Sequence, residues 1–166
     1  MLDKNQINVW EKTELYWTEY EKGVEYYKIV SPSVPMFDWD TGDSAWHPTK
    51  CITFSTKEDV IDFVEKEAKK QHLLISLWKT KGGVHGICLN VQIPCIRAYR
   101  LHKPLGVDPV YSIYTINRGY VLRTSPKKNR PEAKPVHVGV VGRGIALDHN
   151  KEVDEAHTKM INTYFI

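Results

Sequence analysis

Hydrophobic and polar residues follow two different periods along the chain, which predicts both strands and helices. Two runs rich in β-branched and aromatic residues, 24–30 and 36–40, lie on either side of a Ser- and Pro-rich break. Such residues fit the pleated surface of a sheet, so we predict two short strands there. Residues 1–22 mix acidic and aromatic positions without a clear period, and we predict helix or irregular structure for them.

Residues 55–70 carry the clearest helical pattern in the sequence. Ser55 and Glu58 have the spacing of a capping box, in which each side chain bonds a free amide at the helix start. Apolar residues then recur at intervals of three and four, which gives a stripe that can pack on a sheet. The stripe consists of Val60, Phe63, Val64 and Ala68.

A β-hairpin is predicted directly after this helix. Residues 73–79 and 84–91 are strand-like runs, and Thr80-Lys81-Gly82-Gly83 lies between them. Glycine readily adopts the positive backbone angles that tight turns need. The hairpin places His85 near the start of its second strand.

The rest of the chain predicts a helix, two strands and a C-terminal helix, at residues 94–105, 119–124, 136–141 and 151–164. Gly106 suits the end of the first of these helices, and Asp108 before a proline opens a turn. The resulting order of elements, ββαββαββα, favours an α+β fold whose antiparallel or mixed sheet is covered by helices.

Length and composition favour one domain over residues 1–166, because the chain is ordinary in composition and contains no interdomain linker. Its three cysteines form no Cys-x-x-Cys pair, so neither a disulfide framework nor a cysteine zinc site is predicted. No apolar run approaches the ~20 residues that cross a bilayer, and the N-terminus lacks a signal-peptide pattern. We therefore expect a cytoplasmic protein with no membrane partner.

Charged residues are unevenly distributed along the chain. Residues 1–43 hold nine acids against four lysines, whereas residues 95–134 hold nine Lys and Arg against Asp108 and Glu132. A basic segment of this kind suits phosphate groups or a nucleic-acid backbone. Lysine-rich loops are also common on protein surfaces, so charge alone fits a solvated loop equally well.

The first candidate for chemistry is the segment Phe37-Asp38-Trp39-Asp40. Because side chains alternate along a strand, Asp38 and Asp40 share one face, roughly 6.6 Å apart along the strand. Two carboxylates on one face can hold Mg²⁺ or Mn²⁺, which prefer carboxylate oxygen and bridge nucleotide phosphates. The structural alternative is a pair of acids that cap a turn or face solvent.

Further candidates each have a structural alternative. His85 can contact a phosphate, or it is an edge or core histidine. Asp108 can supply a third carboxylate, or it only opens a turn. Arg123 and Lys127 can hold a triphosphate, or Arg123 lies on a solvent-facing strand surface.

The order and spacing of these motifs resemble the catalytic core of the archaeo-eukaryotic primase superfamily, the primase-polymerases. In that family a strand carries an hDhD motif, where h is hydrophobic, a helix follows, a hairpin carries a small-x-His motif, and a later acid completes the metal site. Residues 37–40 match the first motif and Gly83-Val84-His85 matches the second, although the family commonly has Ser where Gly83 stands. The resemblance covers approximately residues 24–141.

The resemblance implies an RRM-like core and a template-dependent nucleotidyltransferase, a DNA primase or polymerase that joins nucleotides by two-metal phosphoryl transfer. It implies that Mg²⁺ or Mn²⁺ is held by Asp38, Asp40 and Asp108. The implied nucleotide-binding residues are His85, Arg123, Lys127 and Lys81, and the implied nucleic-acid-binding residues are Lys128, Arg130 and Lys134. The implied partners are a single-stranded DNA template, nucleoside triphosphates, and a replicative helicase or other replication proteins.

The residues leave two other functions open. A noncatalytic module that binds single-stranded nucleic acid fits a small sheet with aromatic residues and basic loops. A rolling-circle type endonuclease needs a His-hydrophobic-His metal motif, whereas residues 83–86 offer one histidine. Dependence on a metal separates the enzyme from the binding module.

Overall fold

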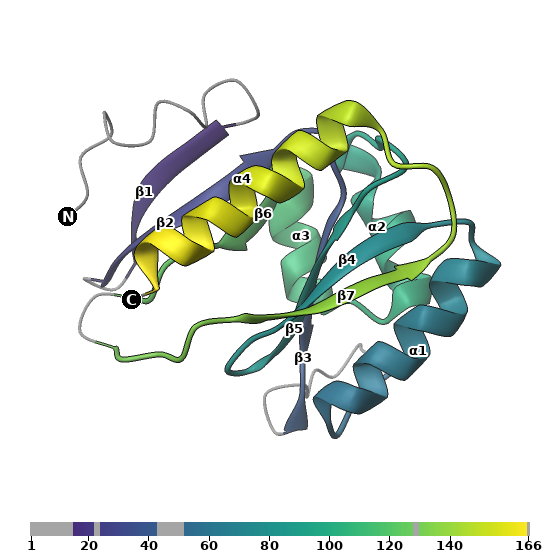
Figure 1. Ribbon diagram of the computed structural model, residues 1–166, viewed down its shortest axis with the longest axis horizontal. Helices are drawn as coiled ribbons and strands as arrows, with labels where there is room; N and C mark the ends of the chain where they lie inside the picture. The colour runs from purple at the N-terminus through teal and green to yellow at the C-terminus, as the bar shows by residue number, and fades with distance from the viewer. Residues whose placement is uncertain (1–14, 22–23, 43–51, 128–129, 166) are drawn as a thin grey trace.

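The computed structural model describes residues 15–21, 24–42, 52–127 and 130–165, and their strands form two antiparallel sheets (Figure 1). The first sheet has the order β1-β2-β6, with β1 at Leu15–Glu21, β2 at Val24–Ser31 and β6 at Tyr120–Arg123. The second has the order β3-β5-β4-β7, with β3 at Met36–Asp40, β4 at Leu74–Lys79, β5 at Gly83–Cys88 and β7 at Val136–Gly142.

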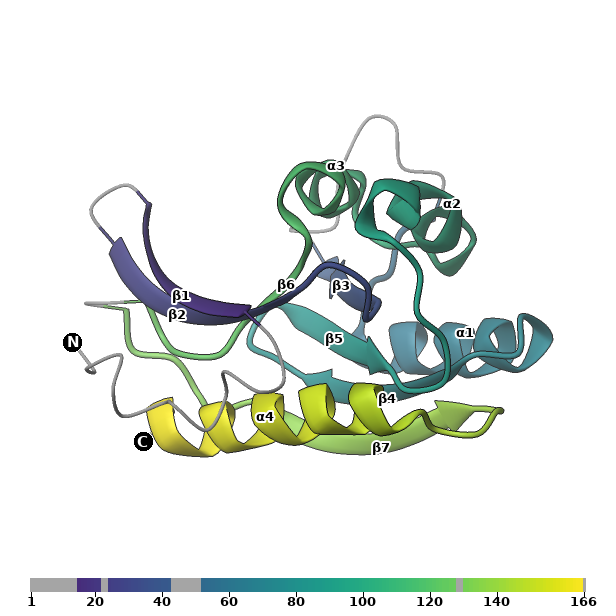
Figure 2. The same ribbon diagram turned by 90° about the horizontal axis from the view of Figure 1, so that it is seen from above.

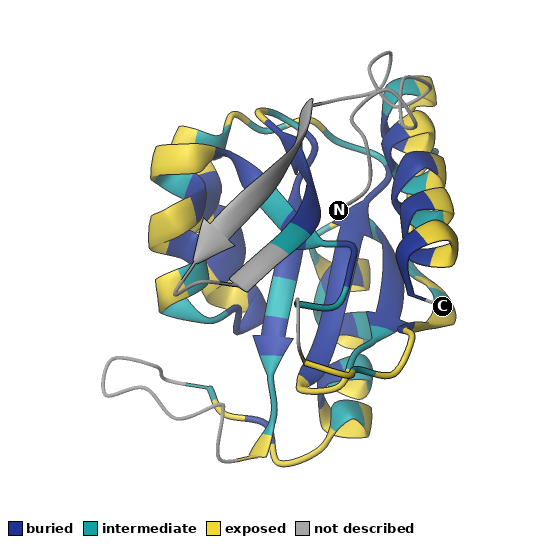
Figure 3. Cartoon of the chain, turned by 90° about the vertical axis from the view of Figure 1, so that its left-hand side faces the viewer, coloured by how far each residue is buried: buried dark blue, intermediate teal, exposed yellow. Residues whose placement is uncertain are grey.

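The helices follow the sheets in the order α1 at Lys57–Lys70, α2 at Ala98–His102, α3 at Pro109–Arg118 and α4 at Asp148–Tyr164. Short 3₁₀ turns, η3 at Cys95–Arg97 and η4 at Lys103–Leu105, flank α2. Figure 2 shows α2 and α3 next to each other, with α4 well apart from them. In Figure 3 most of the described strand surface is buried, while the helices turn exposed sides outward.

In the second sheet, strands β3, β4 and β5 are mostly buried, whereas the edge strand β7 is mostly exposed. Adjacent residues of β3 point to opposite faces and so enter two different cores. One core joins this sheet to α1 and α2, and it includes Phe37, Trp39, Leu77, Val64 and Leu101. The other core joins it to α4 and to the first sheet, and it includes Met36, Ile87, Met160, Ile29 and Leu122. The alternation predicted for residues 36–40 is therefore confirmed, and it fixes the direction of every side chain of β3.

Helix α1 confirms the predicted helix but begins with a different capping box. Thr56 Oγ1 accepts a hydrogen bond from the Asp59 amide at 3.1 Å, and Asp59 Oδ2 accepts one from the Thr56 amide at 3.2 Å. Glu58 instead pairs with Lys79 of β4 at 2.9 Å. The sequence offered the same spacing at Ser55 and at Thr56, so the expected box at Ser55 and Glu58 was one residue early.

Two elements correct the sequence prediction. Residues 15–21 form strand β1, in the region predicted as helix or irregular, because they pair with β2 from Leu15–Val30 to Glu21–Val24. Helix α3 occupies residues 109–118, between the turn predicted at Asp108 and the strand predicted at 119–124, where no helix was predicted. It begins in the way that helices favour, with a proline at its first position and an aspartate before it.

The remaining expectations hold with small shifts. Strands β4 and β5 form the predicted hairpin, closed by a bond from the Thr80 amide to the Gly83 carbonyl at 2.9 Å. Gly106 ends η4 with a φ of 69°, and α4 extends the predicted C-terminal helix toward its N-terminus. The predicted α+β class is thus confirmed, while the single antiparallel or mixed sheet that was predicted is found as two antiparallel sheets. In the part of the chain that the structure describes, every helix is too short or too polar to cross a bilayer.

Candidate functional site

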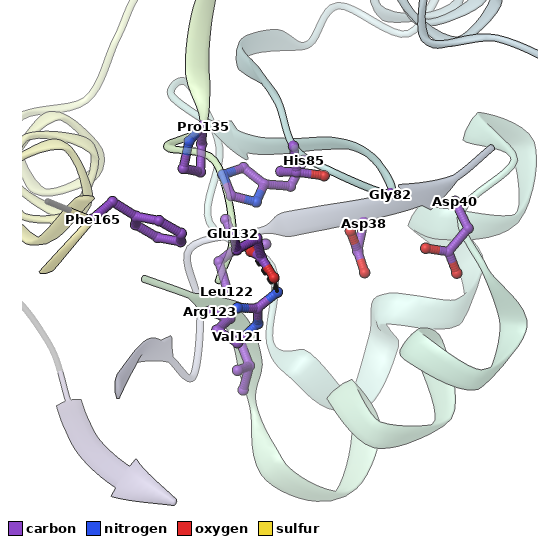
Figure 4. A pocket seen from close by; sticks show the side chains of 11 residues that line it. Asp38, Asp40, Gly82, His85, Val121, Leu122, Arg123, Glu132, Pro135 and Phe165 are labelled. Atoms are coloured by element: carbon purple, nitrogen blue, oxygen red, sulfur yellow. Dashed lines mark hydrogen bonds and ion pairs between the residues drawn. The ribbon is translucent and has the colours of Figure 1, made fainter. Parts of the chain in front are cut away.

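Strand β3 presents Asp38 and Asp40 on one face, as the sequence predicts. Phe37 and Trp39 are fully buried on the other face, where their rings stack with centroids 5.4 Å apart. Trp39 Nε1 donates a hydrogen bond to the Leu105 carbonyl at 2.8 Å. These contacts fix the strand, so both carboxylates project from the same side of it (Figure 4).

Both carboxylates line a cavity of about 170 Å³ at the place where the two sheets meet. Strand β6 of the first sheet forms one wall, and strands β3 and β5 of the second sheet form another. The lining residues are Asp38, Asp40, Thr80, Gly82, His85, Val121, Leu122, Arg123, Glu132, Pro135 and Phe165. The cavity thus collects the predicted Asp38, Asp40, His85 and Arg123 in one place.

His85 is the deepest of these predicted residues, with 4% of its surface exposed. It lies directly opposite Asp38 in the ladder between β5 and β3, so its side chain is on the same face as that carboxylate. Its Nε2 is 3.1 Å from Nε2 of His157, a residue of α4. Burial, followed by the charge of Arg123, lowers the pKa of His85 to about 3, which keeps the ring neutral at pH 7.

Gly83, two residues before His85, has no space for a side chain. A Cβ on Gly83 would collide with the carbonyl oxygen of Trp39 on the neighbouring strand. The serine that the primase superfamily commonly has at this position therefore does not fit the backbone found here. The glycine follows from the close approach of β5 to β3.

Arg123 is partly exposed, and a carboxylate holds its guanidinium at the cavity. Its Nη2 lies 2.9 Å from both carboxylate oxygens of Glu132, and its Nη1 donates to the Ser125 carbonyl at 2.8 Å. The side chain of Glu132 is 8% exposed and that of Arg123 is 31% exposed. Arg123 therefore reaches the cavity with much of its donor capacity already used.

Glu132 is the cavity residue that the sequence analysis missed. Its one sequence signal is that it is the only acid between Arg118 and Lys134, a stretch otherwise rich in Lys and Arg. A lone acid in a basic loop is an ordinary surface feature, so this signal becomes informative only when the loop is seen to fold back on Arg123. Glu132 brings a third carboxylate to the cavity.

Asp108 has a structural task at the start of α3. Its Oδ1 accepts a hydrogen bond from the Val110 amide at 2.8 Å, as an N-cap residue does. Its own amide approaches the Asp38 carbonyl at 3.4 Å, so the backbone of Asp108 is close to β3 while its carboxylate is used by the helix. Its role as third metal ligand stays a prediction.

The two lysines predicted to bind nucleotide lie in different places: Lys81 lies beside the cavity, and Lys127 lies against Tyr26 of β2. Lys81 is exposed in the hairpin turn, between Thr80 and Gly82, which both line the cavity. Lys127 follows β6, and its Nζ is 5.6 Å from the centre of the Tyr26 ring, a cation–π distance. Both remain predictions as nucleotide-binding residues.

The basic loop between β6 and β7 holds the three residues predicted to bind nucleic acid. Arg130 and Lys134 are exposed there, whereas Lys128 lies outside the described residues. The loop includes Glu132 and Pro135 of the cavity wall, so Arg130 and Lys134 are close in sequence to residues that line the cavity. An exposed basic loop beside the cavity fits either a nucleic-acid backbone or solvent.

Asp38 and Asp40 are the cavity residues that could hold a divalent metal ion. Mg²⁺ usually takes one or two protein carboxylates and completes its shell with waters and substrate phosphates. Asp38 and Asp40 supply two carboxylates, and the charge of Asp38 contributes, after burial, to the raised pKa of the neighbouring Tyr111. Among the described residues, no group of three or more His, Cys, Asp or Glu side chains is arranged so that it could hold a metal ion.

Comparisons with known proteins leave the chain without an assigned relative. No family model matches it, and neither a curated protein nor a solved structure matches it.

Proposed function

We propose that this chain is a template-dependent nucleotidyltransferase of the primase-polymerase type, which joins nucleotides on a single-stranded DNA template. The observation that carries the proposal is the shared cavity, in which Asp38 and Asp40 lie on the same face of β3 with His85 beside them and Arg123 across from them. Acids for a metal and basic or neutral donors for phosphate are the two things that phosphoryl transfer needs.

In the proposed reaction, the 3′-hydroxyl of a primer or first nucleotide attacks the α-phosphorus of the incoming triphosphate. The hydroxyl gives its proton to water, its oxygen forms a bond to the α-phosphorus, the bond from the α-phosphorus to the bridging oxygen breaks, and pyrophosphate leaves. Bound Mg²⁺ or Mn²⁺ would stabilise the negative charge that develops on the attacking and leaving oxygens. Asp38 and Asp40 hold the metal in this proposal, and Asp108 or Glu132 is a candidate third carboxylate.

The remaining cavity residues would bind the triphosphate. His85 can donate one hydrogen bond to a phosphate oxygen, and Arg123 can offer its guanidinium once Glu132 gives way. Lys81, between two residues that line the cavity, and Lys127, in the segment after β6, would add positive charge for the phosphates, while Arg130 and Lys134 would follow the template backbone without reading sequence. An RRM-like primase core, a cytoplasmic location and contacts with a helicase or other replication proteins belong to the same proposal.

The proposal is tested by primer synthesis and extension on single-stranded DNA with labelled nucleotides and Mg²⁺ or Mn²⁺. The double variant Asp38→Asn plus Asp40→Asn should lose at least ~100-fold of the metal-dependent incorporation, since it removes the carboxylate charge without changing shape. The matched control is Asp62→Asn plus Glu155→Gln, which removes two acids that are exposed on α1 and α4. Incorporation that survives in the cavity variant would contradict the proposal.

A noncatalytic module for single-stranded nucleic acid is the second candidate, favoured by the pairing of Arg123 with Glu132. In such a protein the cavity would be a structural ion-pair site, and the exposed Arg130 and Lys134 would bind the nucleic acid. This reading predicts metal-independent binding of oligo(dT), no incorporation of nucleotides, and a loss of binding in Arg130→Ala plus Lys134→Ala.

A further inference from the structure

Helix α3 exposes apolar residues and buries polar ones. Its buried residues are Ser112 and Thr115. Val110, Ile113 and Tyr114 are exposed, the last two by 56% and 52%. Because these three residues are three and four positions apart, they form one stripe along the helix. A surface helix normally turns such a stripe toward the core, so the arrangement in α3 is the reverse of the usual one.

The polar side of α3 is used to hold α2. His102 Nδ1 of α2 lies 2.9 Å from Ser112 Oγ, and the two helices lie side by side (Figure 2). On the 3₁₀ turn η3 and on α2, Ile96 and Tyr99 are exposed by 71% and 47%. We call the exposed residues of the segments 96–103 and 110–118 the outer helix face.

The outer helix face is positively charged. Its cations, all exposed, are Arg97, Arg100, Lys103 and Arg118. In the described part of the chain, none of the ion pairs involves Arg97, Arg100 or Lys103. The one acid of residues 95–118 is Asp108, whose carboxylate accepts the Val110 amide at 2.8 Å as the cap of α3. The charge of this face is therefore complementary to a polyanion.

Two exposed tyrosines of this face each have a cation one helical turn further along the chain. Lys103 Nζ is 5.8 Å from the ring centre of Tyr99, and Arg118 Cζ is 5.1 Å from that of Tyr114. Exposed rings beside cations are what proteins use to bind single-stranded nucleic acid, because bases stack on the rings while the cations contact phosphates.

Both ends of α3 adjoin the wall of the cavity. At its start, the Asp108 amide is 3.4 Å from the carbonyl of Asp38, which lines the cavity. At its end, the chain passes through Gly119 into β6, whose residues 121–123 line the cavity. A strand bound along the outer helix face would therefore pass close to the proposed catalytic carboxylates.

We propose that the outer helix face binds single-stranded nucleic acid, with bases stacked on Tyr99 and Tyr114 and phosphates held by the neighbouring cations. Rings and cations alternate here as bases and phosphates alternate along a strand, which favours this ligand over an acidic protein. The face belongs to a different segment of the chain from Arg130 and Lys134. That the bound strand is a template rests on the proposed function, whereas the binding surface does not.

The first test removes the rings. Binding of fluorescein-labelled oligo(dT) is measured by anisotropy in the absence of a divalent metal. Tyr99→Ala plus Tyr114→Ala should bind about 30-fold more weakly than the wild type, since two bases lose their stacking platform. The matched control is Tyr99→Phe plus Tyr114→Phe, which keeps both rings and should bind within about twofold of the wild type. Equal affinities of the alanine variant and the wild type would overturn the proposal.

The second test removes charge and measures the salt dependence of the same binding. Arg97→Gln plus Arg100→Gln should make the slope of log K against log salt concentration less steep by about 1.4, about 0.7 for each lost phosphate contact. The control Lys69→Gln plus Lys70→Gln removes two exposed cations of α1 and should leave the slope unchanged. An unchanged slope in the arginine variant would overturn the proposal. Melting curves establish that each variant folds.

Other outcomes identify a different role for this face. If the alanine variant changes the self-association of the protein in sedimentation but not its affinity for oligo(dT), the face joins copies of this chain and the proposal is wrong. A wild-type protein that binds no oligo(dT) at low salt would likewise overturn it, and would leave an acidic protein as the partner to seek.

Incorporation of dATP on a poly(dT) template separates this proposal from the proposed function. Asp38→Asn plus Asp40→Asn should lose incorporation and keep the affinity for oligo(dT). If the wild type binds oligo(dT) through the outer helix face but incorporates no nucleotide, the proposed function fails and the binding surface stands. If the tyrosine-to-alanine variant incorporates dATP with the same KM for template as the wild type, the binding surface fails and the proposed function stands.

Discussion

Two buried histidine sites of this molecule look alike by exposure and differ in how their nitrogens are satisfied. His102 is fully buried, with Nδ1 2.9 Å from Ser112 Oγ and Nε2 2.9 Å from the Met36 carbonyl. Since a carbonyl only accepts, Nε2 of His102 must carry the proton. His85 has another imidazole as the partner of its Nε2, and that partner can donate or accept.

The comparison shows how a structural histidine differs from a candidate functional one. Burial lowers the pKa of both, to about 4 for His102 and about 3 for His85, so neither burial nor charge state separates them. His102 is locked by a backbone carbonyl and packs edge-on against Phe37 at 5.5 Å. His85 borders a cavity with carboxylates and Arg123, and the partner of its Nε2 is a side chain, His157, instead of a backbone carbonyl.

The largest expected effect is a loss of folding stability at acidic pH, to which both histidine sites contribute. Between pH 6.5 and the lowered pKa values of His85, His102 and His157, the unfolded chain binds protons that the folded chain does not, so stability falls as pH falls. Each such histidine contributes about 1.4 kcal/mol per pH unit in that range. Urea denaturation at about pH 7 and about pH 5 should show a loss of several kcal/mol, partly offset by Asp154, whose pKa burial raises.

The variant His102→Gln, which cannot titrate, should lose less stability over the same interval, by about 2 kcal/mol. Equal free energies of unfolding at the two pH values would mean that these histidines are solvated or protonated in the folded protein.

Removing the imidazole of His102 should lower the stability of the fold and leave the affinity for dATP nearly unchanged. His102→Leu leaves the Met36 carbonyl and the Ser112 hydroxyl without their partner, so the free energy of unfolding should fall by about 3 kcal/mol. Chemical denaturation measures this loss, and titration with dATP and Mg²⁺ should give an affinity within about twofold of wild type. A parallel loss of affinity would place His102 in the ligand site and remove the contrast with His85.

Removing the imidazole of His85 should instead lower the affinity for dATP more than the stability of the fold. His85→Leu should reduce the affinity for dATP with Mg²⁺ by about 10- to 100-fold, the range for a hydrogen bond to a charged group. Stability should fall by only about 1 kcal/mol, because leucine fills the space while His157 loses one partner. Calorimetric titration and urea denaturation of the same preparations give both numbers. A large loss of stability with unchanged affinity would make His85 a second structural histidine.

The smallest expected effect concerns the carboxylate across the cavity. Glu132→Gln weakens the bidentate pair with Arg123, so stability should fall by about 1 kcal/mol or less, and affinity for dATP should rise about threefold as the guanidinium becomes available. Glu155→Gln, an exposed change on α4, is the matched control. A fall in affinity would show that Glu132 helps to hold the metal and does not compete for Arg123.

The sequence predicted the half of the cavity that is built from neighbouring residues. Asp38 and Asp40 share a face because they are two positions apart on a strand, and Phe37 and Trp39 are apolar because they face the core. The hairpin that carries His85 was predicted from the two glycines between its strands. Each of these inferences needed only the local period of the chain and the chemistry of its turns.

Local sequence patterns gave wrong predictions in two situations. In one, two residues offered the same capping spacing; in the other, the secondary structure depends on contacts with another element. Ser55 and Thr56 offered equivalent capping boxes, and only the backbone geometry at Thr56 selects one. Strand β1 has no pattern of its own and exists through its ladder with β2. Helix α3 is rich in β-branched and aromatic residues, which favour strands, yet its capped start and its packing against α2 make it a helix.

By itself the sequence determined the α+β class, the direction of the β3 side chains and a hairpin that delivers His85 to the same sheet, because these depend on residues a few positions apart. Only the tertiary structure decided that His157 meets His85, that Glu132 occupies Arg123 and that His102 bonds Met36, since these contacts join distant segments. Periodicity along the chain determines the face of a strand or helix on which a side chain lies. It does not determine which other element will pack against that face.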